Sequence, residues 1–167
     1  MTKNKIYLSI GSNLGDRAEN IISALSVLKS SGHTEIKKIS SFYETSPVGP
    51  GQNNFYNIVL KAETHLTPEE LLVFIKLAET VLGRKKTKRW GPRIIDIDIL
   101  LYGDTVLNTK KLTIPHQEMR NRLFVLIPLA EIAGGVVYPI LNRKINHILK
   151  NNLLTHKDQK VKIIRNI

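Results

Sequence analysis

Cysteine is absent from this 167-residue chain, and no apolar run approaches the ~18 residues that a membrane-spanning helix requires. Without cysteine the chain can form neither a disulfide framework nor a thiolate metal site, which fits a reducing compartment. The short basic opening leads directly into an alternating pattern and not into a signal sequence. We therefore expect a soluble, cytoplasmic protein with no membrane partner.

Acidic residues are also scarce. Asp and Glu together number 14 against 25 Lys and Arg, which gives a formal net charge of +11. This balance favours phosphates, acidic ligands or nucleic acid as partners without choosing among them. Neither a Walker-type GxxxxGK[ST] sequence nor a GxGxxG sequence occurs, so neither a P-loop nor a Rossmann nucleotide site is indicated. Any ATP site has to be built from side chains.

The hydrophobic content, 42% of the residues, is sufficient for one well-filled core, and we expect a single domain over residues 1–167. The first half of the chain alternates strand and helix signals. A strand pattern over residues 5–10 precedes a helix that opens with a capping pattern at Asp16 and Glu19 and ends at Gly32. Residues 35–43 and 55–63 read as two strands separated by a loop rich in Pro and Gly.

A second helix opens at Thr67, followed by Pro68 and Glu70, and a fourth strand covers residues 94–102. The apolar stripe expected for this helix consists of Leu71, Leu72, Ile75, Leu77, Ala78 and Leu82. The order strand, helix, strand, strand, helix, strand predicts an α+β fold with a ferredoxin-like βαββαβ core, an antiparallel sheet with both helices on one face.

A C-terminal extension of short helices and strands should follow this core. We expect a small strand around Val106 and helices over about residues 121–132 and 142–151. The last residues, 160–167, fit either an edge strand or a frayed end.

Two aspartates interrupt the hydrophobic fourth strand. Because strand side chains alternate, Asp96 and Asp98 should share one face while Ile95, Ile97 and Ile99 share the other. Two like charges on one face repel, so a positive group is expected between them. The residues leave two interpretations open: surface carboxylates on a solvated strand, or a metal site.

A basic segment lies just upstream of the aspartates. Residues 84–93 hold six positive charges and no acid. Carboxylates bind Mg²⁺, Mg²⁺ binds phosphate oxygens, and Arg or Lys neutralises the remaining phosphate charge, as phosphoryl transfer requires. The alternatives are a solvated turn or a nucleic-acid patch. With Gly91, Pro92 and the only tryptophan, Trp90, we expect this segment to be a lid that an anion orders.

A third polar segment, residues 112–124, adds His116, Arg120 and Arg122, with Phe124 close behind. A lone histidine more often makes a structural hydrogen bond than it takes part in catalysis. No nucleophile stands out in this segment.

Five stretches together resemble the 6-hydroxymethyl-7,8-dihydropterin pyrophosphokinase family: "IGSNLGD", "SSFYETSPVGP", "RWGPRIIDIDILLYG", "LTIPH" and "NRLF". The resemblance implies a diphosphokinase (EC 2.7.6.3) of tetrahydrofolate biosynthesis. This enzyme moves diphosphate from ATP to the hydroxymethyl group of the pterin, giving AMP and the pterin diphosphate. It also implies a monomer whose partners are ATP and the pterin and that binds no nucleic acid.

The resemblance further implies roles for individual residues. Asp96 and Asp98 would bind two Mg²⁺ ions, and Arg84 and Arg93 would be catalytic with them. The pterin site would consist of Thr45, Pro47, Val48, Phe55, Asn57, Trp90 and Phe124. The nucleotide site would consist of Glu79, Arg84, Arg93, Ile99, Lys111, Thr113, His116 and Arg122. Phe55 replaces a tyrosine that is frequent in the family, and Lys111 replaces an arginine.

Two other classes of protein compete with this interpretation. A single-stranded RNA-binding module would also combine a basic ferredoxin-like sheet with aromatics. Its third strand needs a glycine-containing aromatic motif, however, whereas "FYNIVLKA" has no glycine and has Asn57 at a stacking position. A regulatory small-molecule-binding domain would explain a pocket but not the aspartate pair. Conversion of ATP to AMP only when the pterin is present would distinguish the enzyme from both.

Overall fold

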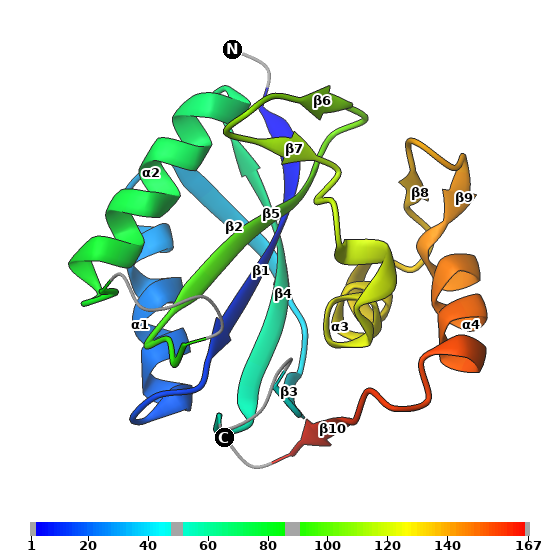
Figure 1. The fold of residues 1–167 in the computed structure, drawn as a ribbon. Coiled ribbons are helices and arrows are strands. Elements are labelled where there is room, and N and C mark those ends of the chain that lie inside the picture. The colour runs from blue at the N-terminus through cyan, green and yellow to red at the C-terminus, as the bar shows by residue number, and fades with distance from the viewer. Residues whose placement is uncertain (1–2, 48–51, 86–90, 166–167) are drawn as a thin grey trace.

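A computed structural model of the chain describes residues 3–47, 52–85 and 91–165 (Figure 1). The elements run in the order β1 (Asn4–Ser12), α1 (Arg17–Ser30), β2 (Thr34–Ile39), β3 (Phe42–Thr45), β4 (Phe55–Thr64), α2 (Pro68–Val81), β5 (Asp96–Tyr102), β6 (Leu107–Asn108), β7 (Thr113–Ile114), η1 (Met119–Asn121), α3 (Leu123–Ala133), β8 (Val137–Tyr138), β9 (Arg143–Lys144), α4 (Ile145–Thr155) and β10 (Val161–Ile164).

The main sheet has the strand order β10-β3-β4-β1-β5, and β2 pairs with β4 on the same side as β3. All of these pairings are antiparallel. Because β2 pairs with the end of β4 and β3 with its start, the two short strands together occupy the place of one long strand. The ferredoxin-like core predicted from the sequence is therefore confirmed, and β10 extends it at one edge.

One face of the sheet packs on α1 and α2, as Figure 1 shows. Ile10 of β1 pairs with Ile58 of β4 on one side and with Ile97 of β5 on the other. All three are buried and belong to the same apolar cluster as Leu28 of α1 and Ile75 of α2. Burying each such side chain stabilises the fold by about 1.5–3 kcal/mol, so this layer holds the two helices on the sheet.

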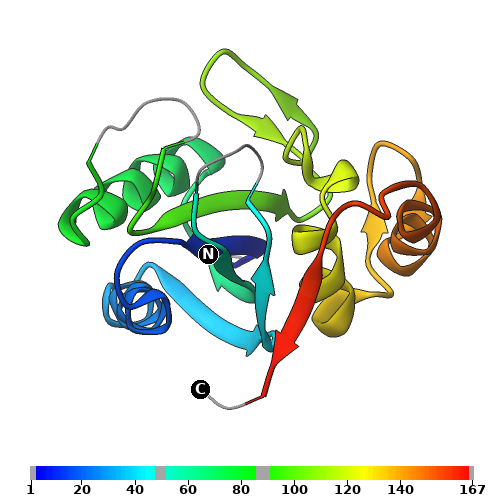
Figure 2. The same ribbon diagram turned by 60° about the horizontal axis from the view of Figure 1, so that its bottom comes forward.

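The opposite face carries a second apolar cluster, formed with the C-terminal extension. Tyr7 of β1 and Val59 of β4 share it with Leu126 and Leu129 of α3 and Ile148 of α4. Seen from another direction in Figure 2, α3 and α4 lie on the far side of the sheet from α1 and α2. Since α3 covers only part of this face, the remainder is free to form a site.

Both expected helix starts are confirmed. The Asp16 carboxylate accepts a hydrogen bond from the Glu19 N–H at the start of α1, and Thr67 and Glu70 form a complete capping box at the start of α2. Gly83 follows α2 with φ +88°, a left-handed conformation that glycine adopts without strain.

The single strand expected over residues 35–43 is wrong, because it breaks into β2 and β3 at Ser40 and Ser41. The Ser40 hydroxyl accepts a hydrogen bond from the Val59 N–H. In a continuous strand, a backbone carbonyl would accept that bond. The Ser41 N–H donates to the Glu131 carboxylate of α3, 3.0 Å away. Side chains thus replace the sheet ladder at this point, which periodicity alone does not reveal.

The expected stripe of α2 was wrong at Leu77, which is 61% exposed. At 100° per residue, Leu77 lies 200° around the helix from the buried Ile75. In the extension, β6 is the small strand expected around Val106, whereas the two expected helices start slightly later than predicted, α3 at Leu123 and α4 at Ile145. Among the described residues, no helix is long and apolar enough to span a bilayer.

Candidate active site

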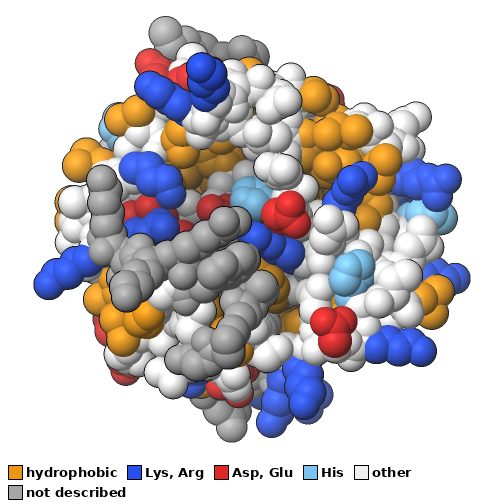
Figure 3. Space-filling view, in the orientation of Figure 1, with side chains coloured by type: hydrophobic (Ala, Val, Ile, Leu, Met, Phe, Trp, Pro, Cys, Tyr) orange, Lys and Arg blue, Asp and Glu red, His pale blue; other side chains and the backbone are white. Residues whose placement is uncertain are grey.

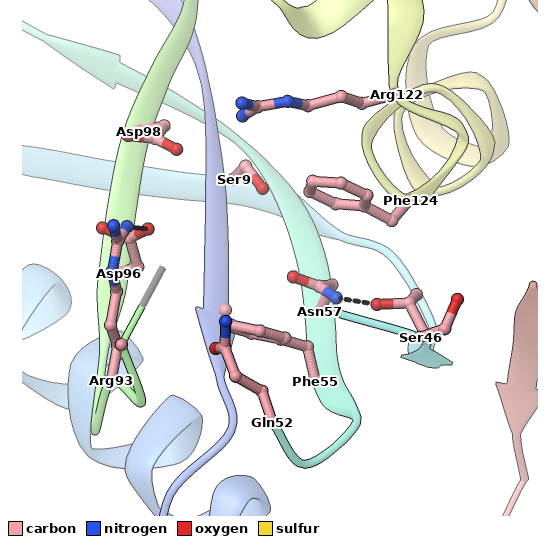
Figure 4. A pocket seen from close by; sticks show the side chains of 13 residues that line it. Ser9, Ser46, Gln52, Phe55, Asn57, Arg93, Asp96, Asp98, Arg122 and Phe124 are labelled. Carbon is pink, nitrogen blue, oxygen red and sulfur yellow. Dashed lines mark hydrogen bonds and ion pairs between the residues drawn. The ribbon is translucent and has the colours of Figure 1, made fainter. Parts of the chain in front are cut away.

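A cavity of about 250 Å³ opens on the sheet face that α3 leaves uncovered (Figure 4). Its floor comes from β1, β4 and β5, and its walls come from β3, from the segment before β5 and from the start of α3. The lining residues are Ser9, Gly11, Thr45, Ser46, Gln52, Phe55, Asn57, Gly91, Arg93, Asp96, Asp98, Arg122 and Phe124.

Strand register brings the polar residues of this floor together. Gly11, near the end of β1, pairs with Asn57 of β4 on one side and with Asp96 of β5 on the other. Two residues earlier, Ser9 pairs with Asp98. Paired residues of an antiparallel sheet point to the same face, so both aspartates and Asn57 surround a row of β1 that carries only small side chains. The cavity exists because that row is nearly empty.

Gly11 is required here because a side chain would not fit, and not because the backbone has a conformation that favours glycine. A Cβ atom at this position would lie 2.6 Å from Oδ1 of Asn57 and 3.6 Å from Cδ1 of Phe55. The first distance is shorter than real Cβ contacts, so any larger residue would displace the Asn57 amide. The glycine therefore fixes how closely Asn57 approaches the centre of the cavity.

The wall next to β3 combines an amide with two aromatic rings. Asn57 is 4% exposed, and its Nδ2 donates to Oγ1 of Thr45 at 2.8 Å. This bond fixes the orientation of the amide, and its carbonyl oxygen points into the cavity. Phe55 comes from β4 and Phe124 from α3, on opposite sides of Asn57 in Figure 4. The guanidinium of Arg122 lies 5.6 Å from the Phe124 ring centroid.

The opposite wall is strongly charged. Nη1 of Arg84 lies 2.7 Å from Oδ1 of Asp96, and Nη1 of Arg93 lies 2.6 Å from Oδ2 of the same carboxylate. Arg84 also contacts Glu79, a carboxylate that is 2% exposed and accepts the Ile97 N–H at 2.7 Å. Glu79 therefore lies behind the cavity, where it holds both Arg84 and the start of β5.

Asp98 has no such guanidinium partner among the described residues. Desolvation at the base of the cavity, together with the charge of Asp96, raises the pKa of Asp98 above its ordinary value. Its nearest basic group is His116, whose Nε2 lies 4.0 Å from Oδ2. Burial lowers the pKa of His116, and Nδ1 of His116 accepts the Glu118 N–H at 3.2 Å. The neutral imidazole then carries its proton on Nε2, facing Asp98.

This donor set fits Mg²⁺ bound together with phosphate. The described residues contain no cluster of three or more His, Cys, Asp or Glu side chains that could hold a metal ion by themselves. Mg²⁺ typically uses one or two carboxylates and completes its coordination with water and substrate phosphates. Asp96 and Asp98 supply the two carboxylates, and a bound cation would offset the desolvation and the charge of Asp96, which raise the pKa of Asp98.

Eight of the residues expected from the family resemblance line the cavity. They are Thr45, Phe55, Asn57, Arg93, Asp96, Asp98, Arg122 and Phe124. Arg84 and His116 contact or face its aspartates. Figure 3 shows acidic, basic and histidine side chains together in the middle of this face of the molecule.

The other expected residues lie elsewhere. Pro47 follows the Thr45–Ser46 wall, the Ile99 side chain belongs to the apolar cluster under α1 and α2, and Lys111 and Thr113 belong to the β6–β7 hairpin. Val48, Trp90 and most of the expected lid lie outside the described residues.

Sequence reasoning did not identify Ser9, Gly11, Ser46, Gln52 and Gly91 as lining residues. A signal for two of them was present, because the aliphatic alternation of β1 already assigns Ser9 and Gly11 to the face opposite Ile10. The alternation does not reveal the strand register, which places Gly11 between Asp96 and Asn57 and places Ser9 beside Asp98.

Comparison with known proteins gives a consistent result. Residues 7–134 match the family described as 7,8-dihydro-6-hydroxymethylpterin-pyrophosphokinase (HPPK). The chain is 46% identical over 150 residues to the 2-amino-4-hydroxy-6-hydroxymethyldihydropteridine pyrophosphokinase of Aquifex aeolicus, covering 89% of this chain and 92% of that one. It is 41% identical over 152 residues to the enzyme of the same name from Haemophilus influenzae, covering 90% and 94%.

Solved structures agree on the fold. A structure described as HPPK-DHPS in complex with substrates matches with a TM-score of 0.77 at 14% sequence identity. The match covers 95% of this chain and 45% of that chain, so the present chain spans less than half of that larger protein.

Proposed function

Because this chain belongs to the 7,8-dihydro-6-hydroxymethylpterin-pyrophosphokinase family, we propose that the cavity between the sheet and α3 is its active site. The enzyme transfers diphosphate from ATP to the hydroxymethyl group of 6-hydroxymethyl-7,8-dihydropterin, in folate biosynthesis. The observation that carries the proposal is the register at Gly11, which sets an amide reader, Asn57, and a carboxylate, Asp96, on either side of one hollow.

The pterin is assigned to the wall formed by Asn57, Thr45 and the two phenylalanines. A pterin is a flat ring with an amide edge, and a buried asparagine held by Thr45 can read that edge with its carbonyl oxygen. Phe55 and Phe124 supply apolar faces from β4 and α3 that hold a flat ring by stacking. With Phe55 in place of tyrosine, the stacking surface remains and a hydroxyl donor is lost.

The phosphates of ATP are assigned to the charged wall. Arg84 and Arg93 both contact Asp96, so two positive charges share this one carboxylate, and Arg84 also contacts Glu79. A triphosphate offers these guanidinium groups additional anionic acceptors, and as they turn toward it they release the Asp96 carboxylate. Asp96 and Asp98 are then free to hold two Mg²⁺ ions, which when bound would neutralise phosphate charge and orient the attacking hydroxyl.

The remaining nucleotide contacts are assigned around this centre. Arg122 and His116 face the aspartates from the α3 side and add donors for phosphate oxygens. Glu79 holds Arg84 from behind, so its part in nucleotide binding is indirect. Ile99 can contribute only backbone groups because its side chain is buried, and Lys111 and Thr113 lie on the β6–β7 hairpin. No proton acceptor is assigned to the pterin hydroxyl.

We further propose that the enzyme is a monomer, that it is cytoplasmic, and that residues 1–167 form one domain. Light scattering tests the oligomeric state, and cell fractionation tests the location.

The site assignment is tested by separating the two substrates. Replacing Asn57 with Ala should weaken pterin binding and leave the affinity for a non-hydrolysable ATP analogue with Mg²⁺ close to that of the unmodified protein. Replacing Arg93 with Ala should weaken the analogue more than the pterin. Val73→Ala, on the exposed side of α2, is the control for both. If Asn57→Ala lowers both affinities equally, or neither, the assigned pterin wall is wrong.

A further inference from the structure

The family match ends at residue 134, yet residues beyond it reach the walls of the cavity. After α4 the chain returns past the start of α3 and joins the sheet as β10, next to β3 (Figures 1 and 2). We name residues 159–164 the tail strap. It contacts α3 at its first residue and β3 along the rest.

At its first residue the tail strap holds the start of α3. Oε1 of Gln159 accepts the Leu123 N–H at 2.8 Å, and Nε2 of Gln159 donates to the Asn121 carbonyl at 2.9 Å. The N-cap residue of α3, Arg122, supplies no side-chain hydrogen bond of its own. Gln159 therefore acts as the missing cap, satisfying one of the free N–H groups of the first turn.

The rest of the tail strap holds the opposite wall. The Ser46 N–H donates to the Lys160 carbonyl at 3.3 Å, and Val161 pairs with Thr45 in the β10–β3 ladder. Thr45 is the acceptor that orients Asn57, and Ser46 lines the cavity. Two neighbouring residues of the strap, Gln159 and Lys160, thus connect the wall that carries Phe124 to the wall that carries Thr45.

We infer that Gln159 is a positioning residue for the pterin: with the strap that follows it, Gln159 sets the separation between Phe124 and the Thr45–Asn57 pair. The inference rests on the proposed assignment of the pterin to this cavity. The charged wall is built on β5 and the segment before it and makes none of its described hydrogen bonds with the strap. Loss of Gln159 should therefore affect the pterin more than ATP.

The test compares Gln159→Ala with two other tail variants. Gln159→Ala loses both contacts, each comparable to an ordinary hydrogen bond, and should weaken pterin binding about tenfold. Gln159→Glu keeps the acceptor for Leu123 and loses the donor to Asn121, so it should fall between Gln159→Ala and the unmodified protein. Asp158→Ala, an exposed neighbour, is the matched control and should bind as the unmodified protein does.

The measurements are equilibrium binding of the pterin in the presence of Mg²⁺ and a non-hydrolysable ATP analogue, binding of the analogue alone, and thermal unfolding. Selective loss of pterin affinity in Gln159→Ala, partly restored in Gln159→Glu, supports the inference. Equal loss of both ligands, or a lower unfolding temperature with unchanged pterin binding, overturns it. If Gln159→Ala does not fold, Gln159→Glu against Asp158→Ala decides by the same criterion.

A fourth variant separates this inference from the proposed function. Phe124→Ala removes an assigned stacking ring without touching the strap. If Phe124→Ala binds the pterin normally, the assigned pterin site is wrong. If Phe124→Ala loses affinity and Gln159→Ala does not, the site stands and the role of Gln159 is wrong.

Discussion

Replacing Gly11 with Ala tests the geometry of the cavity with a single methyl group. The new Cβ would lie 2.6 Å from Oδ1 of Asn57, well inside the 3.0 Å below which real Cβ contacts essentially never occur, so the amide has to retreat by several tenths of an ångström. The central position of β1 between β4 and β5 prevents the backbone from moving instead. The strain therefore falls on the Asn57 side chain.

The consequence for Asn57 follows from its bond to Thr45. Gly11 on β1 and Thr45 on β3 lie on opposite sides of Asn57 on β4, so an amide pushed away from Gly11 is driven against Thr45. The amide has to rotate out of this space, and it then loses its 2.8 Å bond to Thr45. Leaving a buried amide without its partner costs about 1–3 kcal/mol, and a reading group displaced by this much no longer meets its ligand. We expect Gly11→Ala to bind the pterin at least about tenfold more weakly.

The assay is pterin binding with Mg²⁺ and a non-hydrolysable ATP analogue, with affinity for the analogue measured separately. Gly135→Ala is the matched control, because a Cβ at Gly135 would meet nothing within 4 Å. Thermal unfolding of both variants separates misplacement of Asn57 from general loss of structure. Unchanged pterin affinity in a folded Gly11→Ala protein would show that Asn57 does not read the pterin.

Four further predictions concern the charged wall and the core. Asp98→Asn should lower Mg²⁺-dependent turnover by about 10²-fold or more with the circular dichroism spectrum unchanged, and normal turnover would exclude a metal role. Arg93→Ala should lower kcat more than it weakens binding of the ATP analogue; equal losses would mean uniform binding. Glu79→Gln should reduce the free energy of unfolding by about 1–3 kcal/mol in urea titrations, whereas exposed Glu69→Gln on the same helix should not. Burial and the neighbouring Glu131 raise the pKa of Tyr43 from 10.0 to about 12. The contribution of Tyr43 to the free energy of unfolding is therefore complete below pH 10 and is lost as the pH rises toward 12. This loss should be absent in Tyr43→Phe.

The alternation of residues along the chain already determined much of this architecture. Ile97 and Ile99 on one face and Asp96 and Asp98 on the other follow from the two-residue period of any strand, and the structure has this arrangement. The helix starts at Asp16 and Thr67 were equally readable, because a cap is a contact between residues three apart in the sequence. Local rules of this kind need no knowledge of the rest of the chain.

Other features needed contacts that the sequence does not contain. The break between β2 and β3 depends on Glu131, which lies 90 residues away from Ser41. The fate of the last residues was open in the sequence, and pairing of β10 with β3 decided it in favour of an edge strand.

The candidate site likewise combines features that follow from the sequence with features that depend on the fold. The sequence alone determined that two aspartates share a face and that basic residues lie near them along the chain. Only the tertiary structure decided that Gly11 separates Asp96 from Asn57, and that Gln159 caps the helix that presents Phe124. The physical reason is that strand register and capping between distant segments depend on which surfaces pack together, and packing is a property of the whole fold.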